Sequence, residues 1–273
     1  MSAFVLTVCQ RKGGVGRSTL LYSMAGALAK AGQRVLLVDL DPQASISQIC
    51  LTPEAVDTMP AGRTVAAVLA DELFGSSLDL VLPTEIPGIS LLPGGNAVAR
   101  FNHPEPEKAG ELQFALRDSF AELRPHFDAI LCDTPPSLET LSWVPAVAAD
   151  VVITPSPAEP LAVQELAHAG RFLERVRWAH NPRLVWAGVV LTMMSKAAIH
   201  ATFERALRDG YGDLVMKATI PYNVAFKETS LARQPLSHWK PKGAPAKAVE
   251  AVAAEILERV GRLHLGQGGV VAA

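Results

Sequence analysis

Cysteine, aromatic residues and long apolar runs are scarce in this chain of 273 residues, of which 6% are aromatic. The three cysteines, Cys9, Cys50 and Cys132, are odd in number and far apart, which argues against a disulfide framework and a CxxC metal site. Such sparse cysteines are typical of a reducing compartment. No stretch approaches the roughly 18 apolar residues of a membrane span, and residues 1–14 do not resemble a secretory signal. We therefore expect neither a secreted disulfide scaffold nor a membrane-spanning protein.

Net charge is also close to zero, because 25 Lys and Arg stand against 27 Asp and Glu for a formal value of -2. The total hides an asymmetry along the chain. Residues 1–150 hold 10 basic and 17 acidic residues, a net of -7, whereas residues 151–273 hold 15 and 10, a net of +5. Solvated helix faces that happen to differ would explain this split, and so would a basic surface for nucleic acid. The total alone does not decide between them.

Apolar runs of strand length alternate with segments of helical period, which is typical of repeated βα units around a mostly parallel sheet. Several runs are apolar at every position, as strands covered on both faces should be. The sequence therefore predicts an α/β fold with a mostly parallel twisted sheet and helices on both faces. We expect one domain over residues 1–273, with a closing helix at about 246–263 and a short flexible tail at 266–273. The expected strands are 4–9, 35–38, 78–82, 89–92, 129–132, 151–154, 184–191 and 214–220, and the other expected helices are 18–31, 107–123, 139–148, 161–175 and 198–207.

A glycine-rich turn, QRKGGVGRST, follows the first predicted strand and opens the first predicted helix. Such a turn lets successive backbone N–H groups converge on an anion, and the helix N-terminus adds its positive dipole. The Ser18 hydroxyl stands where a P-loop supplies its Mg²⁺ ligand. The alternative is that the glycines serve only a tight turn. We expect a nucleotide phosphate site formed by Lys12, Gly13, Gly14, Val15, Gly16, Arg17, Ser18 and Thr19.

The run KGGVG at residues 12–16 resembles the deviant Walker A motif of the ParA/MinD ATPases. In that family an early lysine, matched here by Lys12, reaches across a nucleotide-sandwich dimer to the partner's phosphates. VLLVDLDPQ at 35–43 resembles the family's second acidic motif, FDAILCDTPPSL at 127–138 its Walker B segment, and IPYNV at 220–224 its adenine-contacting loop. The resemblance runs from residue 4 to about residue 236. It implies a P-loop NTPase that binds ATP and Mg²⁺, closest to the Soj-like ParA partition proteins.

The resemblance also assigns roles to the acidic residues at predicted strand ends. It implies that Asp39 and Asp133 hold Mg²⁺ together with Ser18, and that Asp41 positions the attacking water with Lys12 as the second catalytic residue. Carboxylates at i and i+2 leave a strand on the same side, so we expect Asp39 and Asp41 to face one metal–phosphate centre. Acidic turn residues that cap the next helix are the alternative. Pro221 and Asn223 are the implied adenine contacts, with a plain turn as their alternative.

Arg17 departs from the family pattern, which has lysine at this position. Arginine keeps the charge but is bulkier and planar, so the exchange is not conservative at a close-fitting site. Slowed hydrolysis with binding retained, ordinary turnover after a local adjustment, and a nucleotide-holding switch with little turnover all remain open. We favour slow Mg²⁺-dependent ATP hydrolysis, because Lys12, Asp39, Asp41 and Asp133 are all present.

The resemblance implies an ATP-dependent homodimer on the nucleoid in the cytoplasm, which binds DNA non-specifically and positions DNA or another cargo. A ParB-like or cargo-adaptor protein would stimulate hydrolysis. The family often carries arginine around the adenine-contacting loop, whereas this chain has Tyr222, Ala225 and Phe226 there. The candidate DNA contacts in the basic half of the chain are Lys196, Arg205, Arg208, Lys227 and Arg233.

Two other classes of protein remain as alternatives. A MinD-like membrane switch would need a basic amphipathic C-terminal helix. The predicted closing helix has an apolar stripe, but its opposite face is acidic through Glu250, Glu255 and Glu258, so we expect it to pack on the protein's own sheet. Metabolic P-loop enzymes and iron–sulfur reductases form the other class, although Cys9 and Cys132 lie in predicted core strands and look like small hydrophobes. The stripe consists of Val249, Val252, Ile256, Val260 and Leu263.

Overall fold

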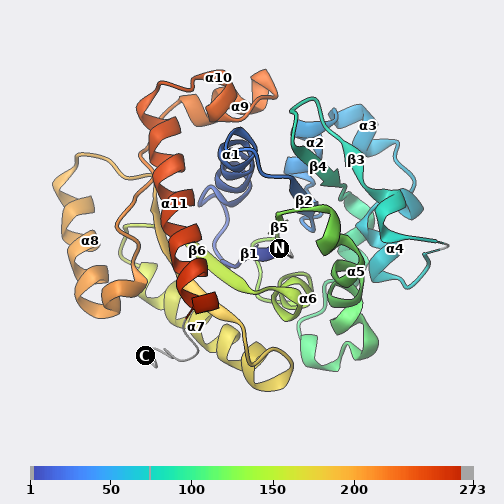
Figure 1. The fold of residues 1–273 in the computed structure, drawn as a ribbon. Helices are drawn as coiled ribbons and strands as arrows, with labels where there is room; N and C mark the ends of the chain where they lie inside the picture. The colour runs from blue at the N-terminus through green and yellow to red at the C-terminus, as the bar shows by residue number, and fades with distance from the viewer. Residues whose placement is uncertain (1–2, 74, 266–273) are drawn as a thin grey trace.

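One seven-stranded sheet organises residues 3–73 and 75–265, which the computed structural model describes, with backbone alone for 262–265 (Figure 1). The strand order is β3-β4-β2-β5-β1-β6-β7, and every neighbouring pair is parallel except β3 and β4. The prediction of a mostly parallel α/β sheet is confirmed. The strands are β1 (Phe4–Val8), β2 (Val35–Asp39), β3 (Leu82–Pro83), β4 (Ile89–Leu92), β5 (Ala129–Asp133), β6 (Val151–Pro157) and β7 (Val185–Thr192).

Helices cover both faces of this sheet (Figure 1). Because successive side chains of a strand point to opposite faces, Leu36 and Val38 of β2 enter one core, whereas Val35 and Leu37 enter the other. The first core contains α4 (Val65–Leu69), α5 (Ala115–Leu123), α6 (Thr140–Ala148) and much of α7 (Ala162–Ala179). The second contains α1 (Arg17–Lys30), α2 (Ser45–Cys50) and α11 (Ala244–Leu265). The remaining α-helices are α3 (Pro53–Asp57), α8 (Ala198–Tyr211), α9 (Ala225–Ala232) and α10 (Leu236–Trp239).

Two predicted strands are wrong. Residues 78–82 lie mostly in a 3-10 turn, Ser77–Leu80, which a capping box between Ser76 and Asp79 starts, and only Leu82–Pro83 pairs as β3. Residues 214–220 approach β7 through the isolated bridge of Val189 with Val215. Two of their backbone N–H groups, of Lys217 and Ala218, donate instead to the carboxylate of Glu255 on α11, at 3.1 and 2.9 Å. These side-chain acceptors replace a strand ladder that the apolar pattern alone suggests.

The C-terminal helix uses its apolar stripe inside the protein. Val249, Val252, Ile256 and Val260 are buried in the core that α11 shares with α1 and the sheet. The expected packing on the protein's own sheet is therefore confirmed for these four residues, whereas the Leu263 side chain and the predicted tail at 266–273 lie outside the described residues. Within the described ranges, no helix combines the length and the hydropathy needed to cross a bilayer.

The three cysteines are buried as free thiols, as the interpretation of Cys9 and Cys132 as small hydrophobes predicts. Burial raises the pKa of the Cys132 thiol to about 12 and that of Cys9 further still. Protonated thiols of this kind are poor metal ligands and nucleophiles. Their burial is that of structural cysteines, in line with the interpretation of Cys9 and Cys132 as small hydrophobes.

Candidate active site

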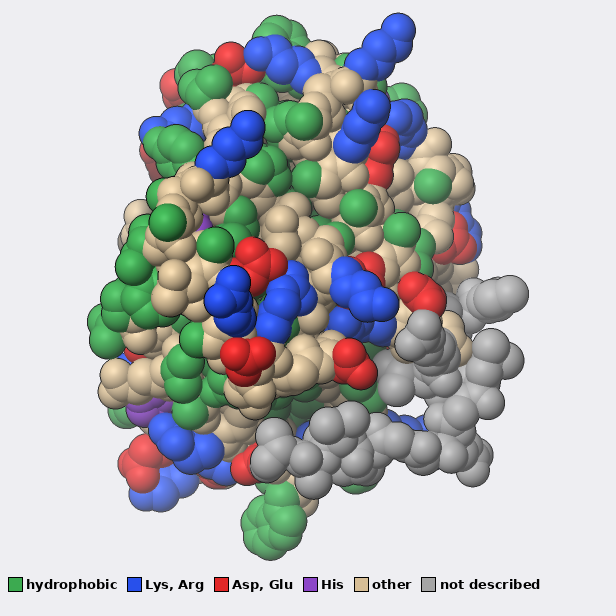
Figure 2. Space-filling view, turned by 90° about the vertical axis from the view of Figure 1, so that its left-hand side faces the viewer, with side chains coloured by type: hydrophobic (Ala, Val, Ile, Leu, Met, Phe, Trp, Pro, Cys, Tyr) green, Lys and Arg blue, Asp and Glu red, His purple; other side chains and the backbone are tan. Residues whose placement is uncertain are grey.

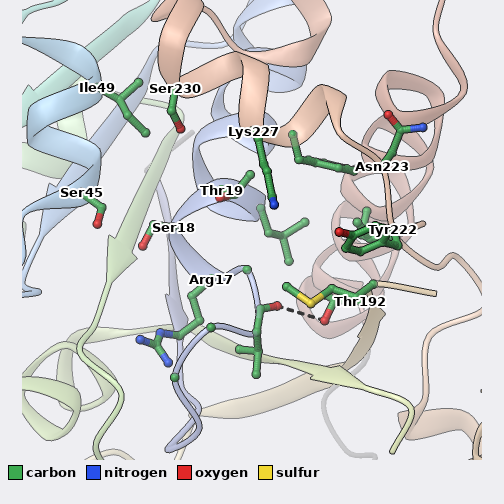
Figure 3. A pocket seen from close by; sticks show the side chains of 18 of the residues that line it. Arg17, Ser18, Thr19, Ser45, Ile49, Thr192, Tyr222, Asn223, Lys227 and Ser230 are labelled. Atoms are coloured by element: carbon green, nitrogen blue, oxygen red, sulfur yellow. Dashed lines mark hydrogen bonds between the residues drawn. The ribbon is translucent and has the colours of Figure 1, made fainter. Parts of the chain in front are cut away.

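A cavity of about 760 Å³ lies where the carboxyl ends of the central strands meet the first turn of α1. This edge is where open α/β sheets bind ligands. Segments from both ends of the chain line the cavity, namely the glycine turn, the loop after β2, the end of β7 and the segment that contains α9 (Figure 3). Its lining includes the predicted residues Gly13, Gly14, Val15, Gly16, Arg17, Ser18, Thr19, Asp41, Pro221 and Asn223.

The glycine turn is shaped for an anion. Gly14 and Gly16 have φ values of 73° and 86°, a left-handed backbone that favours glycine over every other residue type. No side chain caps the N-terminus of α1, so its first N–H groups face the cavity side without an internal acceptor. The hydroxyl of Thr192, at the end of β7, donates to the carbonyl oxygen of Val15 at 3.0 Å (Figure 3). The turn is therefore held in an open form suited to phosphate oxygens.

The guanidinium of Arg17 is committed to the protein backbone. Nη1 donates to the carbonyl oxygens of Gln10 and Lys12 at 3.0 and 2.8 Å, and Nε donates to that of Thr134 at 3.1 Å. Arg17 is 7% exposed, and its guanidinium points away from the side chains on the far side of the cavity (Figure 3). Burial lowers the pKa of Arg17, against the attraction of Asp133 and Asp41. The cation therefore stabilises the wall behind the glycine turn.

Two more basic residues of this turn pair with acidic residues on the segment after β6. The ammonium of Lys12 forms an ion pair with Glu159, and Arg11 pairs with Glu165 on α7 at 2.9 Å. The contact with Arg11 holds the pKa of Glu165 below its usual range. Lys12 is not among the residues that line the cavity. The described fold thus directs Lys12 toward the neighbouring surface and away from the phosphate position of its own chain.

Asp39 and Asp133 end two adjacent strands and are partners in the register of β2 with β5. Both are fully buried, and neither lines the cavity itself. Asp39 Oδ2 accepts hydrogen bonds from the backbone N–H and the hydroxyl of Ser47, at 2.8 and 2.7 Å. Asp39 therefore anchors the start of α2, while Asp41, two residues later, borders the cavity. Asp41 lines the cavity, whereas Asp39 binds Ser47 and does not line it, so a common role of both carboxylates at one metal–phosphate centre stays a prediction.

Asp133 differs from Asp39 in having no hydrogen-bond partner for either carboxylate oxygen within the described residues. Burial, followed by the neighbouring Asp39, raises the pKa of Asp133, and the nearby Ser18 hydroxyl partly offsets this effect. A buried carboxylate without a partner is costly, and a cation beside it would relieve that cost. These features fit a Mg²⁺ site at Ser18 and Asp133. Since no cluster of three His, Cys, Asp or Glu occurs in the described ranges, phosphate and water oxygens would complete the coordination.

Asp41 is buried at the cavity wall. Its Oδ1 accepts from the backbone N–H of Gln43 at 2.9 Å, and its Oδ2 lies 3.9 Å from Nη2 of Arg17. The carboxylate is thus oriented by one hydrogen bond and one ion pair of moderate length. This position suits a group that orients a water molecule inside the cavity.

The far wall of the cavity comes from the loop and helix that follow residue 220. Asn223 Oδ1 accepts from the backbone N–H of Ala225 at 2.9 Å and so helps to start α9. The same wall includes Phe226, Lys227, Ser230 and Leu231. Of these, Ser230 and Leu231 were not among the expected site residues, and Lys227 was expected to contact DNA. The four residues lie three, four, seven and eight residues after Asn223, a helical spacing that places them on one face, and this period was the available signal.

The candidate DNA contacts fall into different environments. Arg208 pairs with Glu204 at 2.8 Å, and Arg233 donates to the carbonyl oxygens of Ile49 and Cys50 at 3.1 Å each. Lys196 and Arg205 are exposed and have no ion pair with another described residue. Lys227 borders the cavity. On the face that carries α8, basic side chains stand among acidic ones at the centre (Figure 2).

Comparisons with known proteins agree with this geometry. The family described as an AAA domain matches residues 3–186. The chain is 34% identical over 263 residues to the chromosome partitioning protein ParA of Caulobacter vibrioides, covering 93% of this chain and 94% of that protein. It is 33% identical to the chromosome-partitioning ATPase Soj of Thermus thermophilus, covering 93% and 96%.

A solved structure of cobyrinic acid a,c-diamide synthase from Mycobacterium smegmatis, with a bound ATP analogue and magnesium, is also similar. It has a TM-score of 0.79 and 28% sequence identity, and the match covers 94% of this chain and 95% of the other. Similarity therefore extends over almost the whole chain in both sequence and fold.

Proposed function

This chain belongs to the ParA family of ATPases, and from that premise we propose that it positions DNA or another cargo through an ATP-driven cycle. The carrying observation is the uncapped N-terminus of α1 behind the glycine turn, with the buried carboxylate of Asp133, which has no hydrogen-bond partner among the described residues, beside it. The partition proteins guide this proposal ahead of the synthase because two of them are closer in sequence, at 34% and 33% against 28%.

ATP and Mg²⁺ are the proposed ligands of the cavity. The backbone N–H groups of the glycine turn and α1 would hold the phosphate chain, and Ser18 and Asp133 would hold the metal ion. When bound, Mg²⁺ neutralises charge on the transferred phosphoryl group. Asp41 Oδ1 accepts a hydrogen bond from Gln43, whereas Oδ2 makes only an ion pair of 3.9 Å with Arg17, so Oδ2 can orient the attacking water. Asp39 supports this centre indirectly, because it fixes α2 next to the end of β5.

Turnover is expected to be slow. Phosphoryl transfer depends on preorganised positive charge at the phosphates. Arg17 spends its donors on three backbone carbonyls, so it supplies little of that charge. The arrangement supports slowed hydrolysis with retained binding, because the amides that bind phosphate remain in place.

The proposed dimer rests on two features of the same face. Lys12 does not line its own cavity, which leaves it to act on the phosphates of a second copy. Large apolar side chains stand exposed at the cavity rim, with Tyr222 65% and Leu231 89% accessible. Exposed apolar groups beside a polar site are typical of an interface between proteins. Closure of two copies face to face would cover them.

The proposed dimer would bind DNA through basic residues of the second half of the chain, with Lys196 and Arg205 as the first candidates. Both are exposed, and no described acidic residue neutralises them. A ParB-like or cargo-adaptor protein would stimulate hydrolysis and so release the DNA. The ATPase would act in the cytoplasm, on the nucleoid.

DNA binding measured with ADP, ATP and a slowly hydrolysed ATP analogue, each across a salt series, tests the proposal. We expect binding with ATP and the analogue but not with ADP, and an affinity that falls with a log–log slope of about -0.9 for each phosphate contact. Binding that ignores the nucleotide, or no binding at all, would contradict the DNA-dependent cycle. Vesicles of anionic lipid serve as the parallel probe for the membrane alternative.

A further inference from the structure

Lys227 occupies a position that its sequence context does not explain. It lies on α9, is exposed, and borders the nucleotide cavity. Its side chain extends from α9 toward Thr19 at the start of α1, so that its nitrogen enters the space above the glycine turn (Figure 3). Within residues 3–73 and 75–265, no acidic side chain is paired with it, and its neighbour Glu228 is taken by Lys240. The cavity therefore contains an ammonium group without a counter-ion.

The basic residues of the glycine turn are all engaged elsewhere. Arg11 pairs with Glu165, Lys12 pairs with Glu159, and the Arg17 guanidinium bonds to backbone carbonyls. Arg17 and Lys227 are the two basic residues in the described lining of the cavity. The Arg17 guanidinium bonds to backbone carbonyls, whereas the Lys227 ammonium has no protein partner in the described ranges. The ammonium of Lys227 on α9 is therefore the cation that remains available to a polyphosphate bound in the cavity.

The position of α9 is fixed relative to the glycine turn. Tyr22 of α1 donates its hydroxyl hydrogen to the carbonyl oxygen of Arg233, just after α9, at 3.0 Å. The Arg233 side chain in turn bonds to the carbonyl oxygens that end α2. Ala225 and Thr229 of α9 are buried, on the face away from solvent. Lys227 is therefore presented to the cavity from a docked helix whose backbone is anchored on both α1 and α2.

We propose that Lys227 binds the phosphate chain of the nucleotide. Its ammonium supplies the positive charge that the Arg17 guanidinium, bonded to backbone carbonyls, does not bring to the phosphates. A lysine ammonium is a compact cation with three rotatable donors, which suits phosphate oxygens. This inference rests on the proposed nucleotide site. It assigns Lys227 to the nucleotide, whereas the sequence pattern placed it among the DNA contacts.

Competition of Mg-ATP, Mg-ADP and adenosine against a fluorescent ATP analogue tests this assignment in Lys227→Met and in the wild-type chain. We expect Lys227→Met to weaken ATP and ADP about tenfold and to leave adenosine unchanged, because a charge-assisted hydrogen bond is lost only with phosphate present. Lys227→Arg should recover much of the affinity. Lys242→Met is the matched control, since Lys242 is also an exposed lysine but does not line the cavity.

Equal loss for ATP and adenosine would overturn the inference, because it would assign Lys227 to the base or to the shape of the loop. Affinities indistinguishable from those of Lys242→Met would overturn it as well. Loss of DNA binding with unchanged nucleotide affinity would return Lys227 to the DNA contacts. A wild-type chain that binds no ATP would instead reject the proposed function itself, so the two failures are distinguishable.

Discussion

Arg17 Nη1 donates a hydrogen bond of 2.8 Å to the carbonyl oxygen of Lys12, five residues earlier in the same turn. This bond ties the start of α1 to the beginning of the glycine turn. Lys12 presents its carbonyl inward to Arg17 and its ammonium outward to Glu159. The two cations expected to serve the phosphates are therefore structural in one case and directed to the surface in the other.

Replacing Arg17 by lysine separates these roles. Arg17→Lys should raise ATP turnover about tenfold, because a compact ammonium on a flexible stem is free to reach phosphate oxygens. The same change should lower the free energy of unfolding by about 2 kcal/mol, since the buried carbonyls of Gln10 and Thr134 and the part-buried carbonyl of Lys12 lose donors. Steady-state hydrolysis and urea unfolding measure the two effects. Arg17→Met, which leaves no cation at this position, should lose stability without gaining activity. An unchanged rate in Arg17→Lys would reject slowed hydrolysis.

Lys12→Ala should abolish ATP-dependent dimerisation while nucleotide affinity of the monomer changes by less than about twofold. The reason is that Lys12 does not line its own cavity, so its phosphate contact would form only across two chains. Sedimentation with ATP and nucleotide titration at low protein concentration give the two values. Arg11→Ala removes the adjacent ion pair with Glu165 and is the control that should still dimerise. A Lys12→Ala chain that dimerises normally would remove the basis for a shared site.

Asp133→Asn should stabilise the nucleotide-free chain increasingly as pH rises. Burial raises the pKa of Asp133, so the folded state keeps its proton at pH values where the unfolded state has lost it. Stability contributed by this group is therefore present below the unfolded pKa of about 3.9 and is lost as pH rises toward the higher folded value. An amide of the same shape carries no such dependence.

Thermal unfolding in a chelator, from about pH 5 to about pH 8, should show the melting temperature of Asp133→Asn gaining on wild type. In the same variant, Mg²⁺ should no longer strengthen ATP binding, because one ligand of the metal is neutral. Asp118→Asn, a change at an exposed carboxylate, is the control for added amide. A constant gap across this pH range would show that Asp133 is not held protonated by its surroundings.

The basic candidates should separate according to their contacts within the chain. Lys196→Ala and Arg205→Ala should each weaken DNA binding and reduce the salt slope by about 0.9, because each would remove one phosphate contact. Arg208→Ala should leave the slope unchanged, since its guanidinium already pairs with Glu204 and bonds to the carbonyl oxygen of Val215. Fluorescence anisotropy with one duplex at several salt concentrations measures the slope. Equal slopes in all three variants would mean that another surface carries the DNA.

Much of the fold was predictable from local signals. The runs around Val35 and Ala129 are apolar throughout because β2 and β5 are covered on both faces, and the sheet forms as expected. Residues 214–220 carry an equally apolar pattern but form no regular strand, because Glu255 of α11 accepts the backbone N–H groups of Lys217 and Ala218 in the middle of the segment. The short helices α2, α3, α4, α9 and α10 were not predicted, since few residues of each repeat at helical spacing.

The sequence by itself determined the class of the protein, because a glycine turn between a strand and a helix, and acidic residues at strand ends, are local signals. Only the tertiary structure decided which groups each charged side chain contacts. Arg17 donates to carbonyls that β5 and the turn bring together, the buried Asp133 has no hydrogen-bond partner among the described residues, and α9 places Lys227 at the cavity. Each outcome depends on contacts between segments far apart in the chain. Residue type sets which charge is present, whereas packing sets which atoms that charge meets.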